Sequence, residues 1–259
     1  MKAGLGVEVR GVTKRFGPTT ALERFDLAVD PGQFVTLIGP SGCGKSTALR
    51  LVAGLTEADE GRVEVGGGPP RAAQSGRQLG FVPQSPSLLP WRTVRSNARL
   101  LSESGRRSGR SGRDLPTTEV DALLEEVGLG EFLDAYPHEL SGGMQQRVAL
   151  VRAFALDAPL LLMDEPFAAL DEITRSEMRY LLLRLCEGRD ATVVFVTHSI
   201  AEAVMLSDRV LVMTGRPGRI ELDEPIPLSR PRTPEQEETT AFFELETRLR
   251  RALRGSTPS

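Results

Sequence analysis

Cysteines and long apolar runs are scarce in this chain of 259 residues, and each absence excludes a class of protein. The two cysteines, Cys43 and Cys186, lack the spacing of a disulfide framework, which favours a reduced, cytosolic setting. No stretch approaches the ~18 apolar residues of a membrane span. Apolar runs such as those at 160–163 and 193–196 are strand-sized. Residues 1–11 lack the apolar core of a signal peptide. If the protein serves a membrane, we expect it to do so from the cytosolic side through another chain.

Lysine is also scarce. Of the 32 basic residues only Lys2, Lys14 and Lys45 are lysines, which leaves 32 − 3 = 29 arginines. A lysine in this chain therefore stands out against a strong background of arginine. The formal net charge of −3 provides no overall attraction to nucleic acid, so we expect no nucleic-acid partner.

Strand-like and helix-like patterns alternate along the chain, which predicts an α/β fold with a mainly parallel sheet covered by helices. Residues 7–38 read as strands with turns, and the apolar run Phe34–Ile38 precedes a glycine-rich turn and a helix at about 45–53. Further strands are predicted at 62–65, 78–82, 160–163, 192–197, 209–213 and 220–222.

The stretch from 85 to 157 is helical in character and is predicted to be inserted into the sheet domain. Within this stretch, one helical face is predicted by apolar residues at helical spacing, namely Val120, Leu123, Leu124 and Val127. After the strand at 160–163, a second helical face is predicted by Met178, Leu181, Leu182 and Leu185. Between residues 102 and 113 the chain is rich in glycine, serine and arginine. We expect a mobile solvated loop there, and a contact with acidic lipid headgroups or a partner is the alternative. A last helix is predicted over 234–253.

A glycine-rich segment between a buried strand and a helix matches the phosphate-loop pattern G-x-x-x-x-G-K-[ST] through Gly39, Pro40, Ser41, Gly42, Cys43, Gly44, Lys45, Ser46 and Thr47. Glycines leave room for backbone N–H groups to converge on phosphate, and the following helix start adds partial positive charge. Lys45 is expected to reach the terminal phosphates, where an arginine fork would fit differently. The Ser46 hydroxyl is expected to coordinate Mg²⁺. The pattern predicts an ATP site.

Two adjacent acids end the apolar strand at 160–163. Asp164 is the candidate to hold Mg²⁺, and Glu165 is the candidate to orient or deprotonate the attacking water. Since adjacent residues on an extended chain point to opposite sides, we expect the two acids to do different jobs. A merely solvated acid pair is the alternative.

One of the two histidines also follows a predicted strand. His198 comes directly after the strand at 192–197, where it is expected to contact the terminal phosphate of the nucleotide. His138 has no such placement and reads as a loop or surface residue.

A second glycine motif opens a helix far along the chain. Ser141 can cap this helix, and Gly142 and Gly143 leave its N–H groups bare, which predicts a second anion site. An ordinary capped helix is the alternative for this segment taken alone.

Together these residues resemble the nucleotide-binding subunits of ABC transporters, over roughly residues 7–222. The resemblance implies a RecA-like phosphate-loop NTPase core with an antiparallel β part and an inserted helical subdomain. Phe16 is similar to the aromatic residue that stacks on adenine, a core phenylalanine being the alternative, and Gln84 to the glutamine that touches Mg²⁺ and couples to the membrane partner. Ser141, Gly142 and Gly143 resemble the signature motif, which binds the ATP held by the other subunit. Asp171 resembles the loop that crosses the dimer interface, and His198 the switch histidine.

The resemblance also implies an organisation and partners. The ATP-binding core spans 1–84 and 158–222, the helical subdomain 85–157, and a C-terminal tail with a helix 223–259. Two copies are expected to form a homodimer at the cytoplasmic face of the membrane, bound to integral permease subunits and indirectly to a substrate-binding protein.

Less specific motifs, such as those at 89–94 and 214–218, resemble motifs of the nitrate, sulfonate and taurine importer branch of this family. Trp91, the only tryptophan, is expected either to lie with Gln84 at the groove for the membrane subunits or to fill the core. An ABC ATPase for another substrate class such as lipid, a non-transport ABC ATPase, and a plain phosphate-loop kinase or GTPase are the rival interpretations.

Overall fold

The structure is a computed structural model that describes residues 4–107 and 114–255. Its centre is a six-stranded sheet with the order β5-β6-β7-β3-β8-β9. The first five strands in this order run parallel, and β9 is antiparallel to β8. Their bounds are β3 (Phe34–Ile38), β5 (Leu79–Val82), β6 (Leu160–Asp164), β7 (Thr192–Val196), β8 (Arg209–Met213) and β9 (Ile220–Pro225).

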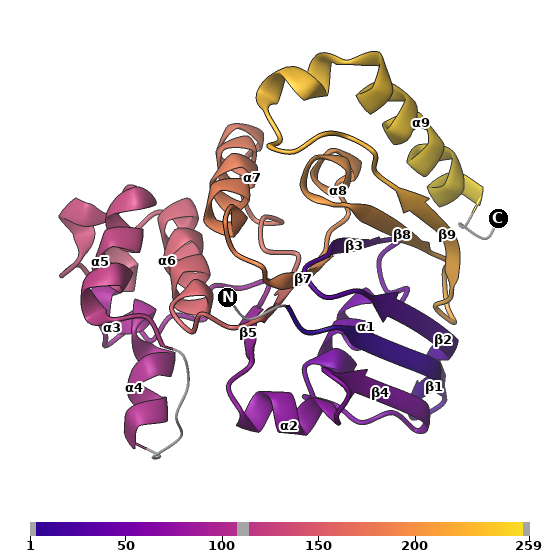
Figure 1. Cartoon of the computed structure of the whole chain (residues 1–259), viewed down its shortest axis with the longest axis horizontal. Helices are drawn as coiled ribbons and strands as arrows, with labels where there is room; N and C mark the ends of the chain where they lie inside the picture. The colour runs from indigo at the N-terminus through magenta and orange to yellow at the C-terminus, as the bar shows by residue number, and fades with distance from the viewer. Residues whose placement is uncertain (1–3, 108–113, 256–259) are drawn as a thin grey trace.

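A second, antiparallel sheet has the order β2-β1-β4. It is formed by β1 (Val7–Phe16), β2 (Thr19–Val29) and β4 (Glu60–Val65), and Figure 1 shows it beside helix α1. Phe25, Leu27 and Val29 of β2 are all buried and alternate with exposed residues, as in a half-buried strand. The predicted mixture of a mainly parallel core and an antiparallel part is confirmed.

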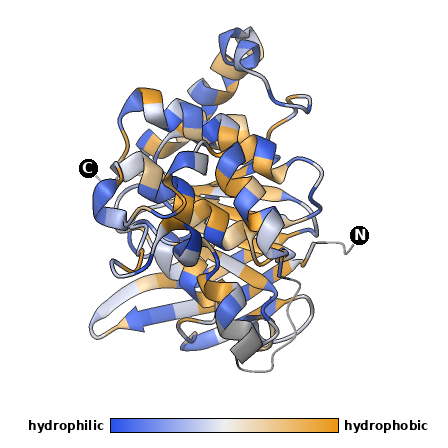
Figure 2. Cartoon of the chain, turned by 90° about the vertical axis from the view of Figure 1, so that its left-hand side faces the viewer, coloured by the Kyte–Doolittle hydropathy of each residue, from blue (hydrophilic) through white to orange (hydrophobic). Residues whose placement is uncertain are grey.

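Helices cover the six-stranded sheet on both faces. Their bounds are α1 (Lys45–Val52), α2 (Pro70–Ser75), α3 (Val94–Ala98), α4 (Leu100–Arg107), α5 (Thr117–Glu126), α6 (Gly142–Phe154), α7 (Glu172–Cys186), α8 (Ile200–Leu206) and α9 (Thr240–Gly255), with 3₁₀ turns at Gly130–Phe132, Pro137–Glu139 and Pro234–Glu238. The strands are apolar on both sides because both faces are covered, and hydrophobic residues accordingly gather at the centre of the molecule (Figure 2).

Alternate residues of one strand enter different cores. Val35 and Leu37 of β3 pack in a cluster with α1 and the antiparallel sheet, whereas Phe34 packs with α6 and α7. Ile38 joins a third cluster with α8 and α9. This two-sided burial fixes the sheet, and with it the positions of the loops that follow its strands.

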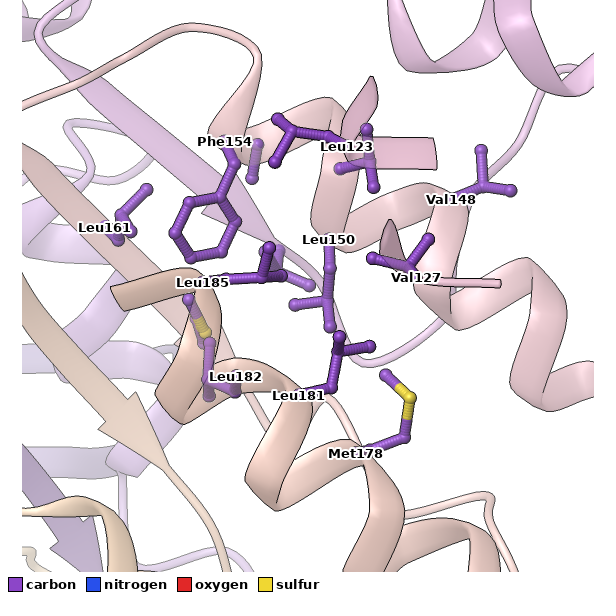
Figure 3. Close-up of a cluster of buried hydrophobic side chains, with 14 of the residues drawn as sticks. Leu123, Val127, Val148, Leu150, Phe154, Leu161, Met178, Leu181, Leu182 and Leu185 are labelled. Carbon is purple, nitrogen blue, oxygen red and sulfur yellow. The ribbon is translucent and has the colours of Figure 1, made fainter. Parts of the chain in front are cut away.

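Helices α3 to α6 lie together on one side of the sheet (Figure 1). The predicted apolar faces of α5 and α7 meet there, and Figure 3 shows Leu123 and Val127 with Leu150 of α6 and Leu181 of α7 in one buried cluster. This cluster also holds Leu161 of β6, so the helical part packs directly on the sheet.

Two sequence-based predictions of local structure are wrong in part. Residues 102–107 are the end of α4 rather than a loop, while residues 108–113 lie outside the described residues. Ser102 is buried and donates to the Arg99 carbonyl at 3.2 Å, so tertiary packing overrides a composition that favours loops. The predicted helix at 234–253 is a 3₁₀ turn followed by α9, because the Thr239 hydroxyl accepts from the Phe242 N–H at 3.3 Å and starts a new helix.

Across the described residues, no helix has both the length and the apolar character needed to cross a bilayer.

Candidate functional site

Five neighbouring parallel strands end at one edge of the sheet, and the loops that follow them carry the candidate residues. In the order β5-β6-β7-β3-β8, the first four strands are followed by Gln84, Glu165, His198 and the phosphate loop. Ligands in such sheets bind outside the carboxyl ends of the strands. The topology therefore brings together residues that lie up to about 160 positions apart in the chain, because His198 and Gly39 follow adjacent strands.

The phosphate loop joins β3 to α1 in a backbone conformation that requires glycine at two positions. Gly42 has φ 76° and Gly44 has φ 104°, both in the left-handed region. A Cβ on Gly44 would lie 2.6 Å from a methyl carbon of Leu22 and 2.9 Å from the Ala21 carbonyl oxygen. The loop is therefore packed directly on β2. Its N–H groups precede the start of an eight-residue helix, which is the arrangement that binds phosphate.

Lys45 lies within this loop and is only 5% exposed. Its Nζ donates to the carbonyl oxygens of Gly39 at 2.8 Å and Pro40 at 3.2 Å, and it lies 3.9 Å from a carboxylate oxygen of Glu165. These acceptors hold the ammonium group at the centre of the loop, where a slim point charge can reach phosphate. Cys43 is buried beneath the loop, and its backbone N–H donates to the Pro40 carbonyl at 3.3 Å.

Asp164 and Ser46, two of the predicted magnesium ligands, are in direct contact. The Ser46 hydroxyl donates to a carboxylate oxygen of Asp164 at 2.6 Å. Burial raises the pKa of the Asp164 carboxyl, although the Ser46 hydrogen bond opposes this shift. No group of three or more His, Cys, Asp or Glu side chains forms a metal cluster among the described residues. One carboxylate, one hydroxyl and the amide oxygen of Gln84 instead fit Mg²⁺, which prefers few protein ligands together with nucleotide phosphates.

Glu165 is surrounded by the other residues predicted for hydrolysis. Its carboxylate lies 3.4 Å from Nδ1 of His198, and it accepts from Nε2 of Gln84 at 3.5 Å. His198 is 55% exposed at its side chain, so it can contact a bound ligand. The carboxylate thus stands between a lysine, a histidine and an amide that come from three other loops, which suits a group that orients water beside phosphate.

The backbone at Glu165 differs from the sequence-based expectation. The strand ends at Asp164, and Glu165 has φ 45°, so the acid pair is not extended as predicted. A hydrogen bond of 2.9 Å from the Glu165 N–H to the Val196 carbonyl holds this left-handed conformation. Left-handed residues other than glycine cost free energy and persist where surrounding contacts fix them. The two acids nevertheless have different partners, as expected.

A cavity of about 450 Å³ opens over the phosphate loop. It is lined by Phe16, Thr19, Ala21, Ser41, Gly42, Gly44, Lys45, Ser46, Thr47, Gln84, Glu165 and Arg216. Phe16 is 54% exposed at the β1–β2 hairpin, so its alternative assignment as a core residue is wrong. The cavity lining thus includes an exposed aromatic ring, which suits a base, and Lys45, which suits a phosphate chain.

The second glycine motif does not line this cavity. Ser141 caps α6 as predicted, because its hydroxyl accepts from the Met144 N–H at 3.2 Å. A Cβ on Gly142 would have nothing within 4 Å. A Cβ on Gly143 would lie 2.9 Å from the Thr174 methyl group. Thr174 in turn donates its N–H and hydroxyl to Asp171 at 3.0 and 2.8 Å, and these bonds lower the pKa of the Asp171 carboxyl. Asp171 therefore caps α7 beside the start of α6, and both helix starts are exposed.

Two residues are placed more clearly by the structure than by the sequence. Trp91 is 71% exposed, so its alternative assignment as core filling is wrong. Arg216 lines the cavity but was absent from the predicted site. Its position directly after the strand Arg209–Met213, at the same sheet edge as the other candidates, is the signal that could have identified it. His138 is exposed, as predicted.

Comparison with known proteins places this geometry in a family. The model of a family described as "ABC transporter" matches residues 22–168. The chain is 44% identical over 252 residues to the aliphatic sulfonates import ATP-binding protein SsuB 1 of Burkholderia lata, covering 96% of this chain and 72% of the relative. It is also 44% identical over 230 residues to the SsuB 1 protein of Xanthomonas axonopodis, covering 89% and 88% respectively.

A solved structure with a similar fold is the dimeric post-hydrolysis state of the ATP-binding cassette MJ0796 bound to ADP and Pi. It has a TM-score of 0.72 and 33% sequence identity, and the match covers 86% of this chain and 100% of that chain.

Proposed function

The chain belongs to the ABC transporter family, and from that premise we propose that it drives the import of nitrate, sulfonate or taurine-like solutes. It binds ATP and is an ATPase, as its family membership shows. Two relatives named for aliphatic sulfonate import support the substrate class, since each shares 44% of its aligned residues with this chain. The solute itself does not touch an ATP-binding subunit. The substrate assignment therefore depends on the sequence similarity between this chain and the two sulfonate import proteins.

The roles of the site residues follow from their positions. Lys45 and the loop N–H groups hold the terminal phosphates, and the exposed ring of Phe16 stacks on adenine. Mg²⁺, held by Ser46, Asp164 and Gln84, neutralises phosphate charge when bound. Residues 39–47 otherwise contribute backbone contacts, so catalysis depends on positioning and electrostatics rather than covalent chemistry.

Glu165 orients or deprotonates the attacking water, and His198 contacts the terminal phosphate. The His198 ring lies 3.4 Å from the carboxylate of Glu165, which lines the cavity, and this proximity supports a shared role for the two residues. A carboxylate within hydrogen-bond reach of the water is the group that can accept its proton. The histidine at the end of the neighbouring strand β7 fixes the side on which this water stands.

A second copy of the chain completes the site. The start of α6, formed by Ser141, Gly142 and Gly143, is exposed and does not line the cavity of its own copy. A Cβ on Gly142 would have nothing within 4 Å. Such a start binds anions well, so it suits the phosphates of a nucleotide held by the partner copy. Asp171, which caps the adjacent helix α7, lies at the same interface. ATP then joins the two copies, and hydrolysis separates them.

The observation that carries the transport proposal is the loop from Gln84 to Trp91, which connects the cavity to the surface. Buried Asn97 holds its far end: its side chain accepts from the Leu89 N–H at 2.8 Å and donates to the Arg92 carbonyl at 2.9 Å. Arg152 of α6 donates to the carbonyls of residues 86 and 87 at 2.7 and 2.9 Å. An exposed tryptophan on a fixed loop is a suitable docking residue for integral permease subunits.

We further propose the organisation that the resemblance implies. The ATP-binding core comprises 1–84 and 158–222, the helical subdomain 85–157, and the C-terminal tail 223–259. The helical subdomain moves with Arg152 and the attached loop when ATP joins two copies at the cytoplasmic face of the membrane. A substrate-binding protein is then an indirect partner through the permease, and no nucleic acid takes part.

Replacing Trp91 with alanine is expected to leave the ATPase rate of the isolated chain within about twofold and to weaken binding to the permease about thirtyfold, because a buried interface tryptophan contributes about 2 kcal/mol or more. The measurement is co-purification from detergent-solubilised membranes with the permease subunits encoded beside the chain. Phe243→Ala, which removes another exposed aromatic ring from α9, is the matched control and should co-purify normally. Normal co-purification of Trp91→Ala would remove Trp91 from the docking surface.

The proposed function is tested by uptake. The chain, its membrane subunits and their binding protein are reconstituted in liposomes with ATP inside or outside, and entry of labelled ethanesulfonate, taurine and nitrate is measured. ATP-dependent entry of one of these anions is the expected result. ATP-dependent movement of lipid instead, or no ATP-dependent entry of any of the three anions, would overturn it.

A further inference from the structure

The fifth parallel strand of the series, β8, also ends at the nucleotide edge of the sheet. It is hydrogen-bonded to β3, the strand that leads into the phosphate loop. The loop that follows it, residues 214–218, carries Arg216 into the lining of the same cavity. The four other strand ends have been given roles in ATP hydrolysis, whereas this one has none.

The loop 214–218 is held rigidly against the phosphate loop and β2. The Gly218 N–H donates to the Ala21 carbonyl at 3.0 Å, and the Thr214 N–H donates to the Arg219 carbonyl at 2.9 Å. A Cβ on Gly218 would lie 2.0 Å from the Cys43 carbonyl oxygen, so the two loops approach closely at this glycine. Arg216 is therefore presented from a fixed backbone.

The guanidinium of Arg216 lies against the phosphate loop itself. Its Nε donates to the Gly42 carbonyl at 2.7 Å. A Cβ on Gly42 would lie 2.7 Å from Nη2 and 3.3 Å from the central carbon, so a side chain there would displace the guanidinium. Gly42 is thus required both for its positive φ and for the space that Arg216 occupies.

The charge of Arg216 is not neutralised by an acid. Within residues 4–107 and 114–255 no carboxylate forms an ion pair with Arg216. Two other arginines of the same hairpin do have acidic partners: Arg219 pairs with Glu23, and Arg209 pairs with Asp223 at 2.6 Å. Arginine has five N–H donors in a fixed fork, and the Gly42 carbonyl occupies only one of them. The remaining donors and the full charge are free to bind an anion.

We propose that Arg216 is a further nucleotide-binding residue. Its Nε keeps the hydrogen bond to the Gly42 carbonyl, and its terminal amino groups bind phosphate oxygens of the nucleotide. Two cations, Lys45 from within the loop and Arg216 from above it, then flank the phosphate chain. A guanidinium suits this position because its planar fork can contact the loop and a phosphate simultaneously. This inference rests on the nucleotide site proposed above.

The test is the affinity of the isolated chain for Mg-ADP, measured by titration calorimetry. ADP is chosen because it is the product of the reaction and is not hydrolysed during the titration. Arg216→Gln keeps an N–H donor for the Gly42 carbonyl but removes the charge, and Arg216→Lys keeps the charge. We expect Arg216→Gln to weaken ADP binding about five- to twentyfold, as befits a partly solvated charged hydrogen bond, and to flatten the dependence of affinity on salt. Arg216→Lys keeps the charge but not the planar fork, so it is expected to lose clearly less ADP affinity than Arg216→Gln.

The neighbouring Arg219 is the matched control, because Arg219→Gln removes an arginine from the same hairpin that pairs with Glu23 instead of lying in the cavity. It should bind ADP normally. Unchanged ADP affinity in Arg216→Gln would overturn the inference. Equal loss in Arg216→Gln and Arg216→Lys, with a lowered melting temperature in both, would also overturn it, because Arg216 would then only brace the loop.

Failure of this inference is distinguishable from failure of the site. Lys45→Ala, measured in parallel, loses ADP affinity if the phosphate loop holds the nucleotide. If Lys45→Ala loses affinity and Arg216→Gln does not, the site stands and the role of Arg216 is refuted.

Discussion

Replacing Glu165 with glutamine is expected to lower steady-state ATP hydrolysis by about 10²- to 10⁴-fold while ATP binding is retained. The loss has this size because positioned general bases contribute a rate factor of that order. Glutamine has the same shape as glutamate, so the contacts with Gln84 and His198 can persist and the cavity keeps its form. The change also removes a negative charge that lies 3.9 Å from Lys45 and beside the position proposed for the terminal phosphate. ATP should therefore bind at least as tightly and hold two copies together.

The measurement for this variant combines phosphate release with size-exclusion chromatography in Mg-ATP. Its matched control is Glu57→Gln, which removes an exposed surface carboxylate that pairs with Arg71 at 2.8 Å. The control should hydrolyse ATP normally and show no ATP-trapped pair. Turnover of Glu165→Gln within about threefold of the unmodified chain would contradict the assignment, since a removed base cannot leave the rate intact.

Replacing Lys45 with alanine is expected to weaken ATP binding about 10- to 100-fold, the effect of losing a charged hydrogen-bond donor to phosphate. Lys45 is the only basic residue of the segment 39–47, and its buried ammonium group is held on the Gly39 and Pro40 carbonyls. Hydrolysis should fall to background because the phosphates are no longer positioned.

Lys45→Arg tests whether the positive charge at this position is sufficient for hydrolysis. The charge is kept, but the guanidinium is wider than an ammonium group and carries its donors in a rigid plane. A chain with 29 arginines has ample access to arginine, so the lysine reflects the shape of the site. We expect Lys45→Arg to melt near the temperature of the unmodified chain and to hydrolyse ATP at least tenfold more slowly. Full hydrolysis by this variant would show that charge alone suffices.

Much of the site was predictable because its residues follow short apolar runs. Asp164 and Glu165 end the run at 160–163, and His198 follows the run at 192–197, so each could be assigned to the carboxyl end of a strand. The order of the strands could not be predicted, because pairing between β6, β7 and β3 is a long-range property of the sheet. That order is what places His198 between the acid pair and the phosphate loop.

The features that the sequence did not reveal depend on contacts between distant segments. Arg216 reads as part of a turn until the loop is seen against Gly42, 174 residues away in the chain. The left-handed backbone of Glu165 depends on its bond to Val196 of another strand. Ser102 is helical because tertiary packing buries it. Local propensity determines none of these three features.

The central claim is that each nucleotide is bound between the phosphate loop of one copy and the Ser141 helix start of the other. Two defective chains test it, both in the Glu165→Gln background so that bound ATP is not hydrolysed. Lys45→Ala damages the phosphate loop, and Gly142→Asp places a carboxylate at the exposed helix start. The second change should not disturb folding, because nothing lies within 4 Å of the added Cβ.

The most direct measurement is the number of ATP molecules retained per pair after the two chains are mixed with Mg-ATP and passed through a size-exclusion column. Neither chain alone is expected to form an ATP-bound pair. A mixed pair has one intact combination, the phosphate loop of the Gly142→Asp copy with the helix start of the Lys45→Ala copy. We therefore expect mixed pairs that retain one ATP. A mixture that forms no ATP-bound pairs, like either chain alone, would contradict a shared site.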